Sequence, residues 1–289
     1  HNNEQEELKK LKEKNTALIV KGVEVWIFDY ENKDITWSNE LVNHVIEFKN
    51  PIPDRNLLFL KDCFKDNISL VNSILTKHDC CLMPTATHPF MNPEKESKLW
   101  LHGHKKIYNK YHEIFNCKGH GWTNLQSVHL NLPFSGDFEM RKLHSAVRIV
   151  LPLIPAICAS SPITEGKLTG IKDTRLEFYK NNQKRIPSIT GKIIPEVIKS
   201  KKEYIEKILN PMYKDISEYD KEKTLQKEWL NSRGAVIKFS RNSLEIRLID
   251  IQECISADIS IVWCLANTIK NIINGKYSSL DVQESFTED

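Results

Sequence analysis

The stretch LQSVHLNLPFSGD, residues 125–137, places polar side chains on alternate positions of an otherwise apolar segment. In an extended chain, side chains alternate between the two faces with a period of two. His129 and Asn131 therefore share a polar face, and valine and leucine occupy the opposite face. An imidazole on such a face is able to bind a metal ion, although a hydrogen-bonded structural histidine is the simpler interpretation.

The segment SLEIRLID, residues 243–250, repeats this alternation with charged residues. Glu245 and Arg247 are two positions apart, so they share one face of a strand whose other face is apolar. A carboxylate beside a guanidinium forms either a structural ion pair or a metal ligand next to a phosphate clamp. From these residues alone, the structural ion pair is the simpler interpretation.

Two further carboxylates, Glu40 and Glu47, are separated by seven residues in SNELVNHVIEF. Seven residues make two helical turns, so the two side chains share a face if the segment is helical. If the segment is extended, they point in opposite directions. A solvated face is the usual meaning of such a pair, and its spacing does not decide between these structures.

Several other kinds of site are excluded or disfavoured. The chain contains neither GxxxxGK[ST] nor GxGxxG, which excludes a P-loop or a Rossmann nucleotide site. His102, His104, Cys117 and His120 do not have the spacing of a closed tetrahedral zinc site.

The composition predicts a folded chain with small-molecule rather than polymeric partners. The 289 residues are 40% hydrophobic, enough for a substantial core. With 41 Lys and Arg against 38 Asp and Glu, the formal charge is +3. A balance this close to neutral argues against nucleic acid or a membrane surface as the main partner.

The cysteine pattern and the apolar segments indicate the cytoplasm. Seven cysteines without regular spacing do not resemble a disulfide scaffold, so we expect a reduced protein. The longest apolar runs are too short and too rich in proline to span a bilayer. Residues 1–16 are predicted to be a charged tail or helix, and residues 17–289 a single domain.

Hydrophobic periodicity predicts a mixture of helices and strands. The expected elements are a hairpin turning at 31–33, a helix over 54–78, a buried strand from Cys80, a helix over 97–115, the strand over 125–137, a helix over 137–162 broken at Pro152 and Pro155, an irregular segment over 163–200, a helix over 201–216, a hairpin over 235–254 and a helix over 256–275 capped by Ser256 or Asp258. This order lacks regular βαβ alternation and therefore favours an α+β fold with an antiparallel sheet.

Five blocks together resemble the glutamate–cysteine ligase type 2 family, the carboxylate–amine ligases. The resemblance runs from about Gly22 to the terminal helix. The blocks are MPTATHPFMNPEKESKLW, FNCKGHGWTNLQSVHLNLPF, LPLIPAICASSPITEGKLTG, NNQKRIPSITG and SLEIRLIDIQEC. The resemblance implies a glutamine-synthetase-like catalytic fold, in which a curved antiparallel sheet binds divalent metals and ATP on its concave face and packs helices on its other face.

The resemblance also implies an ATP-dependent reaction. In this family the γ-carboxylate of glutamate is phosphorylated, and an amine attacks the resulting acyl phosphate to form an amide. A carboxylate that attacks a polyphosphate needs its negative charge neutralised, which hard cations and an arginine are suited to do. We therefore expect ATP and Mg²⁺, or Mn²⁺ in its place, as cofactors.

The resemblance assigns roles to the polar residues described above. Glu40, Glu47, His129 and Glu245 match metal-binding positions of the family. Arg247 matches the arginine that contacts the transferred phosphoryl group, so Arg247 and Glu245 are the expected catalytic residues. Asn131 accompanies His129 on its face and is expected to contact substrate or ATP.

The first strand departs from the family pattern. The family usually has a Glu-x-Glu pair there, whereas KGVEVWIFD contains Glu24 alone. Glu24 is the expected metal ligand of this strand. The departure leaves a second hypothesis open, a catalytically degenerate member that binds a nucleotide or a partner.

The substrate-binding residues are expected in three other blocks. Arg175, Gln183 and Arg185 are candidates to hold a substrate carboxylate, with pairing to acids of neighbouring loops as the alternative. Arg233 and Lys238 are candidate phosphate contacts, with solvated positions as the alternative. The expected substrates are glutamate, or another carboxylate, and an amine or amino acid, with cysteine and glutathione biosynthesis as the family expectation. A homodimer is the default expectation for the oligomeric state.

Overall fold

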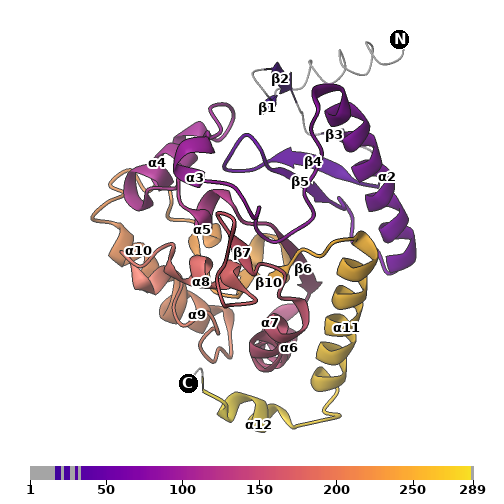
Figure 1. Cartoon of the computed structure of the whole chain (residues 1–289). Helices are drawn as coiled ribbons and strands as arrows, with labels where there is room; N and C mark the ends of the chain where they lie inside the picture. Colours follow the sequence, from indigo (N-terminus) through magenta and orange to yellow (C-terminus); the bar gives the residue numbers. More distant parts are fainter. Residues whose placement is uncertain (1–16, 21–22, 27–29, 32–33, 288–289) are drawn as a thin grey trace.

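The computed structural model describes the backbone of residues 17–20, 23–26 and 30–31, and the backbone and side chains of residues 34–287 (Figure 1). The predicted tail at residues 1–16 lies outside this part of the chain. The described residues combine helices with antiparallel sheets, so the prediction of an α+β fold is confirmed.

In the described part of the chain, the strands form four antiparallel sheets, with the orders β6-β10-β9, β3-β4-β5, β1-β2 and β7-β8. Their bounds are β1 (Ala17–Val20), β2 (Val23–Trp26), β3 (Tyr30–Glu31), β4 (Thr36–Asn39), β5 (Ile46–Lys49), β6 (Ser127–Pro133), β7 (Ile163–Thr164), β8 (Lys167–Leu168), β9 (Ala235–Lys238) and β10 (Ser243–Asp250).

The helices lie mostly between and after these strands. Their bounds are α2 (Leu57–Leu75), α3 (Pro93–Glu96), α4 (Lys105–Phe115), α5 (His120–Thr123), α6 (Gly136–Val150), α7 (Ile154–Cys158), α8 (Thr174–Asn181), α9 (Lys201–Tyr204), α10 (Asn210–Ile216), α11 (Ile255–Ile273) and α12 (Leu280–Ser285). The short helical segments are η1 (Thr76–His78), η2 (Leu151–Leu153), η3 (Pro187–Ile189), η4 (Ile205–Leu209), η5 (Glu228–Leu230) and η6 (Phe239–Arg241).

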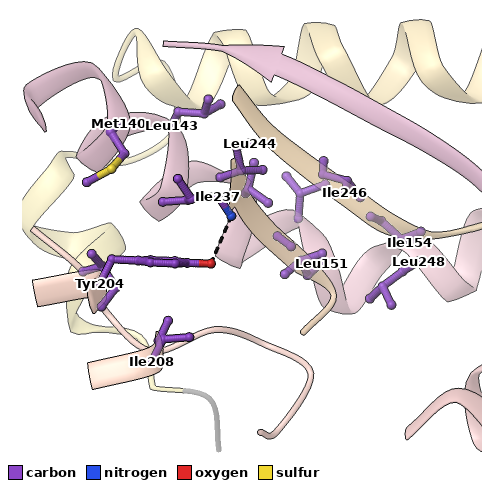
Figure 2. Packing of buried hydrophobic residues seen from close by; sticks show 14 of the residues in the cluster. Met140, Leu143, Leu151, Ile154, Tyr204, Ile208, Ile237, Leu244, Ile246 and Leu248 are labelled. Carbon is purple, nitrogen blue, oxygen red and sulfur yellow. Dashed lines mark hydrogen bonds between the residues drawn. The ribbon is translucent and has the colours of Figure 1, made fainter. Parts of the chain in front are cut away.

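The central sheet follows from the alternation seen in the sequence. Leu244 and Ile246 of β10 and Ile237 of β9 are buried, and they pack with residues of α6, α7 and α9 (Figure 2). This arrangement leaves the alternate side chains of β10, including Glu245, on the opposite face. Burial of one face therefore fixes which residues line the polar face.

Tyr204 of α9 links the helices below the sheet to β9. Its ring is fully buried, and its hydroxyl accepts a hydrogen bond from the backbone N–H of Ile237 at 3.0 Å (Figure 2). The same hydroxyl accepts a second hydrogen bond from Nδ2 of Asn231 at 2.7 Å. The aromatic ring thus contributes apolar burial while its polar end is satisfied.

The sheet β3-β4-β5 packs against α2 in a second, separate core. Its buried residues are Ile35 and Trp37 from the sheet side and Val71 and Leu75 from α2. The indole Nε1 of Trp37 donates to Oδ1 of Asn67 at 2.8 Å, which satisfies the polar atom of a side chain that is 2% exposed. Helix α11 contacts α2, and its upper end lies next to the lower end of α2 in Figure 1.

The expected break at the two prolines is confirmed. Helix α6 ends at Val150, the tighter turn η2 contains Pro152, and α7 restarts with Pro155 in its first turn. Proline lacks the N–H that an uninterrupted helix needs and is tolerated in a first helical turn.

Other expected elements differ from the structure. No strand forms at Cys80–Cys81, because Leu82 N donates to the side chain of Asn72 instead of to a neighbouring strand. The helix expected over 97–115 begins only at Lys105. The segment expected to be irregular contains α8, and α11 begins after Cys254, so neither Ser256 nor Asp258 is its N-terminal cap. Among the described residues, no helix is both long and apolar enough to span a bilayer.

Candidate functional site

The polar face of the central sheet is built on β10. Glu245 lies directly opposite Asn131 of β6 and Val236 of β9, and Lys238 lies opposite Ser243. Residues directly opposite in an antiparallel pair point to the same face. The strand register therefore places Glu245, Asn131 and Lys238 on the same face of the sheet.

Arg247 lies beside a β-bulge. The pairing of β10 with β6 changes register between Ile246 and Ile249, which gives β10 one extra residue at this point. Arg247 Nε donates to Oε1 of Glu245 at 2.7 Å, and its Nη1 donates to the backbone carbonyl of Asn231 at 3.2 Å. The guanidinium is thus held at two of its nitrogens.

Glu245 is surrounded by positive charge. Lys238 Nζ lies 3.5 Å from Oε1 of Glu245, on the same oxygen that Arg247 contacts. Burial acts to raise the pKa of Glu245, but Arg247, then His129 and Lys238, outweigh it and lower this pKa to about 2. Glu245 is therefore a carboxylate at every physiological pH.

The pKa values of Arg247 and Lys238 are shifted in opposite directions by burial and the neighbouring charges. Burial acts to lower the pKa of Arg247, but Glu245 and then Tyr179 raise it above its ordinary value. Burial and then Arg247 lower the pKa of Lys238, against the opposing effect of Glu245. The face consequently keeps a permanent positive charge at Arg247.

His129 remains neutral at physiological pH. Its ring is exposed to solvent, but the protein packed around it is dense enough that desolvation lowers its pKa to about 4, against the opposing effect of Glu245. Its Nε2 lies 3.1 Å from the hydroxyl of Ser127. A neutral imidazole is the form that binds metal ions.

Glu40 and Glu47 come from β4 and β5 rather than from a helix. Glu40 directly follows β4, and Glu47 lies in β5 opposite Ser38. Burial and then the charge of Glu47 raise the pKa of Glu40 to about 7. Arg247 of the central sheet acts to lower the pKa of Glu40.

Glu47 is held by neighbours on its own hairpin. Ser38 Oγ donates to its Oε2 at 2.7 Å, and Lys49 Nζ approaches the same oxygen at 2.9 Å. Burial acts to raise the pKa of Glu47, but Lys49 and Ser38 outweigh it and lower this pKa. His129, when protonated, also acts to lower this pKa, so it is the residue of β6 whose charge reaches Glu47.

The chemistry of these donors fits a hard divalent cation. Carboxylate oxygens are the ligands that Mg²⁺ prefers, and Glu40 and Glu47 repel each other without a cation between them. In the described part of the chain, no three His, Cys, Asp or Glu side chains are close enough together to hold a metal ion. Glu24 lies on β2, and its side chain is outside the described residues.

Arg175 is placed inside the protein rather than on the polar face. Its side chain is 1% exposed and forms an ion pair with Asp250, which is 0% exposed. Asp250 also accepts from Ser160 N at 2.9 Å and from Ser161 Oγ at 3.2 Å. The guanidinium therefore anchors α8 to the end of β10.

Gln183 and Arg185 also contact protein groups. Gln183 is 3% exposed, and its amide bonds to the hydroxyls of Ser232 and Thr190, both at 2.8 Å. Arg185 Nη1 donates to the carbonyl of Ile114 at 2.8 Å, and its guanidinium lies 5.1 Å from the centre of the Tyr219 ring. Neither side chain is placed in contact with Glu245 or Arg247.

Arg233 is neutralised by another acid. Its Nε and Nη2 bind the two carboxylate oxygens of Glu196 at 2.7 and 2.5 Å. The Arg233 side chain is 4% exposed. A bidentate pair of this kind occupies the donors that a phosphate would need.

The sequence reasoning missed several residues of the site. Tyr108 of α4 accepts from Asn39 at 3.3 Å, and burial followed by Glu40 raises its pKa to about 12. Ser38 and Lys49 position Glu47. They could have been identified from the register of the hairpin β4–β5, but the sequence did not decide whether this segment is a hairpin. Asn231, whose carbonyl binds Arg247, has no such signal.

Comparisons with known proteins identify relatives of the chain. The model of glutamate-cysteine ligase family 2 matches residues 3–281. An uncharacterized protein from Archaeoglobus fulgidus is 40% identical over 224 residues, which cover 78% of this chain. The chain spans 60% of the length of that relative. The resemblance read from the sequence is confirmed, and the chain belongs to glutamate-cysteine ligase family 2.

Proposed function

We propose that the chain is an ATP- and Mg²⁺-dependent carboxylate–amine ligase with a glutamine-synthetase-like catalytic fold. It phosphorylates the γ-carboxylate of glutamate and joins it to an amine. The observation that carries this proposal is the polar face on which Arg247 binds Glu245, together with the electrostatic effect of Arg247 on Glu40 and of His129 on Glu47 of the second sheet. Family membership supports the same reaction class.

The chain's own residues provide the charges that phosphoryl transfer requires. A carboxylate and a polyphosphate repel each other, so the transition state needs positive charge that is already fixed in place. Arg247 supplies a permanent charge whose direction is set by Glu245 and by the carbonyl of Asn231. Lys238 supplies a second charge on the same face.

Glu40, Glu47, His129 and Glu245 are the described residues that would hold Mg²⁺, and Glu24 is proposed to join them. No three of the described residues are close enough together to hold the ion in this structure, so the two sheets would have to move closer together to bind it. Bound Mg²⁺ would neutralise phosphate charge in the site. Ser38 and Lys49 restrain the Glu47 carboxylate, and the low pKa of Glu245 keeps it ionised. Neutral His129 keeps a lone pair available as a donor.

The deciding experiment measures ADP release by the full chain with Mg²⁺, ATP, glutamate and a panel of amines and amino acids. We expect release that requires both glutamate and an amine. The matched control is Glu113→Gln, which removes an exposed carboxylate paired with Lys110 on α4. Nucleotide binding without turnover for any amine would favour the alternative, a relative that has lost catalysis because Glu24 stands alone in its strand.

A further inference from the structure

Arg247 is held at both its backbone and its side chain by one short loop. This loop, residues 230–234, is called the brace loop below. The backbone N–H of Arg247 donates to the carbonyl of Gly234 at 2.9 Å, and Arg247 Nη1 donates to the carbonyl of Asn231 at 3.2 Å. The position of the guanidinium therefore depends on the position of the brace loop.

Asn231 fixes its own carbonyl through its side chain, which is fully buried. Its Nδ2 donates to the hydroxyl of Tyr204 at 2.7 Å, and that hydroxyl is bonded to β9 at Ile237. Its Oδ1 accepts from the backbone N–H of Arg233 at 3.1 Å and from Arg233 Nη1 at 3.3 Å. One amide thus connects the guanidinium of Arg247 to the hydrophobic core.

The rest of the brace loop is pinned to a neighbouring segment. Ser232 N donates to the carbonyl of Ile189 at 2.9 Å, and Gly234 N donates to the carbonyl of Ile193 at 2.7 Å. A Cβ at Gly234 would lie 2.7 Å from Cδ1 of Leu248, so a side chain at this position would push the loop off β10.

Arg233 also holds the brace loop in place. Its Nη1 donates to the carbonyl of Ser188 at 3.0 Å, while Glu196 binds its other two nitrogens. Its charge is already neutralised, so it acts on the site by holding Asn231 and not by contacting phosphate.

We propose that Asn231 is a positioning residue that fixes the guanidinium of Arg247 through the brace loop. Its consequence for catalysis rests on the ligase function proposed above. A misplacement of about 1 Å at a reacting centre costs on the order of 10²-fold in rate. Loss of the Asn231 side chain should therefore lower kcat by 10- to 100-fold and leave the KM values for ATP and glutamate within about twofold.

Three variants of the full chain test this proposal. Asn231→Ala removes the bonds to Tyr204 and Arg233, and Asn231→Asp keeps an oxygen that accepts from Arg233 and places a second oxygen where the Tyr204 hydroxyl is able to donate to it. Gln283→Ala is the matched control, because Gln283 is another buried amide, is 2% exposed, and donates to the carbonyls of Ile272 and Ser278 near the C-terminal end. A general effect of destabilisation would appear in both alanine variants.

The rate of rotation about the Nε–Cζ bond of Arg247 reports how firmly the brace loop holds the guanidinium, and its measurement does not require catalysis. This rate is measured by ¹⁵N NMR. The Arg247 signals are assigned by their loss in Arg247→Lys. We expect rotation at least about tenfold faster in Asn231→Ala, wild-type rates in Gln283→Ala, and recovery in Asn231→Asp, with kcat following the same order. Unchanged rotation in Asn231→Ala would overturn the proposal whether or not the protein is active. Inactivity of the wild type would overturn the ligase function alone, and the rotation rate would still decide the role of Asn231.

Discussion

The ion pair between Arg175 and Asp250 gives a prediction that separates structure from substrate binding. The two side chains are 1% and 0% exposed. Replacing Arg175 by alanine leaves the Asp250 carboxylate buried with two remaining donors, Ser160 N and Ser161 Oγ. Removing one partner of a buried pair costs about 3–5 kcal/mol, because the remaining charge is uncompensated.

This magnitude converts into a measurable shift. For a chain of this size, 1 kcal/mol shifts the melting temperature by roughly 2 °C, so Arg175→Ala should lower it by about 6–10 °C. The double variant Arg175→Met with Asp250→Asn should recover at least half of the loss, because neither charge remains. Arg185→Ala is the control, since Arg185 is exposed and should cost less than about 1 kcal/mol.

Calorimetry and glutamate titrations together test this account. If Arg175→Ala unfolds within about 0.5 kcal/mol of the wild type while the KM for glutamate rises tenfold, Arg175 binds substrate and the structural assignment is wrong.

Three further predictions concern other parts of the molecule. Arg247→Lys keeps a positive charge beside Glu245 but loses the planar donor fork, so activity should fall on the order of 10²-fold with little change in melting temperature; retained activity would contradict the phosphoryl-binding role. His144 is 1% exposed, neither of its ring nitrogens has a hydrogen-bond partner among the described residues, and burial, followed by nearby arginines, lowers its pKa from 6.5 to about 3. The unfolded chain binds this proton more readily, so stability should fall as the pH drops from 6.5, by at most about 1.4 kcal/mol per pH unit. His144→Leu should flatten that fall in urea titrations at several pH values, and an unchanged slope would exclude His144 as its source. Gly234→Ala should cost about 1–3 kcal/mol through contact with Leu248, measured by chemical denaturation, and a neutral result would show that the brace loop yields easily.

The two strands that carry the central site could be predicted from the sequence. In β6 and β10 the apolar residues alternate with polar ones, so the residue types already separate His129, Glu245 and Arg247 from the apolar side chains of the core. The proximity of Glu40 and Glu47 could not be predicted in the same way, because the sequence SNELVNHVIEF is compatible with both a helix and a strand. The hairpin β4–β5 decided it through long-range packing on α2.

The basic residues show a different limit of sequence reasoning. Arg175, Arg185 and Arg233 have the chemistry of carboxylate or phosphate ligands, but their partners lie 75, 71 and 37 residues away along the chain. The sequence shows which residues carry a positive charge, but only the folded structure shows which group each of them binds. The alternative of pairing with an acid describes Arg175, which binds Asp250, whereas Arg185 binds a backbone carbonyl and Arg233 is paired with Glu196 rather than solvated.

The division of the site between two sheets has a consequence for how the protein loses activity. Arg247 lies on the strand that covers the large core containing Tyr204, whereas Glu47 lies between residues that pack on the smaller core of Ile35, Trp37, Val71 and Leu75, and Glu40 precedes Leu41 of another small core. A core that buries less apolar surface has a smaller free energy of local unfolding. The hairpin β4–β5, which carries Glu47 and ends beside Glu40, therefore belongs to the less stable cooperative unit. At low urea concentrations, local unfolding of the hairpin β4–β5 should therefore abolish catalysis while Arg247 and the brace loop remain folded.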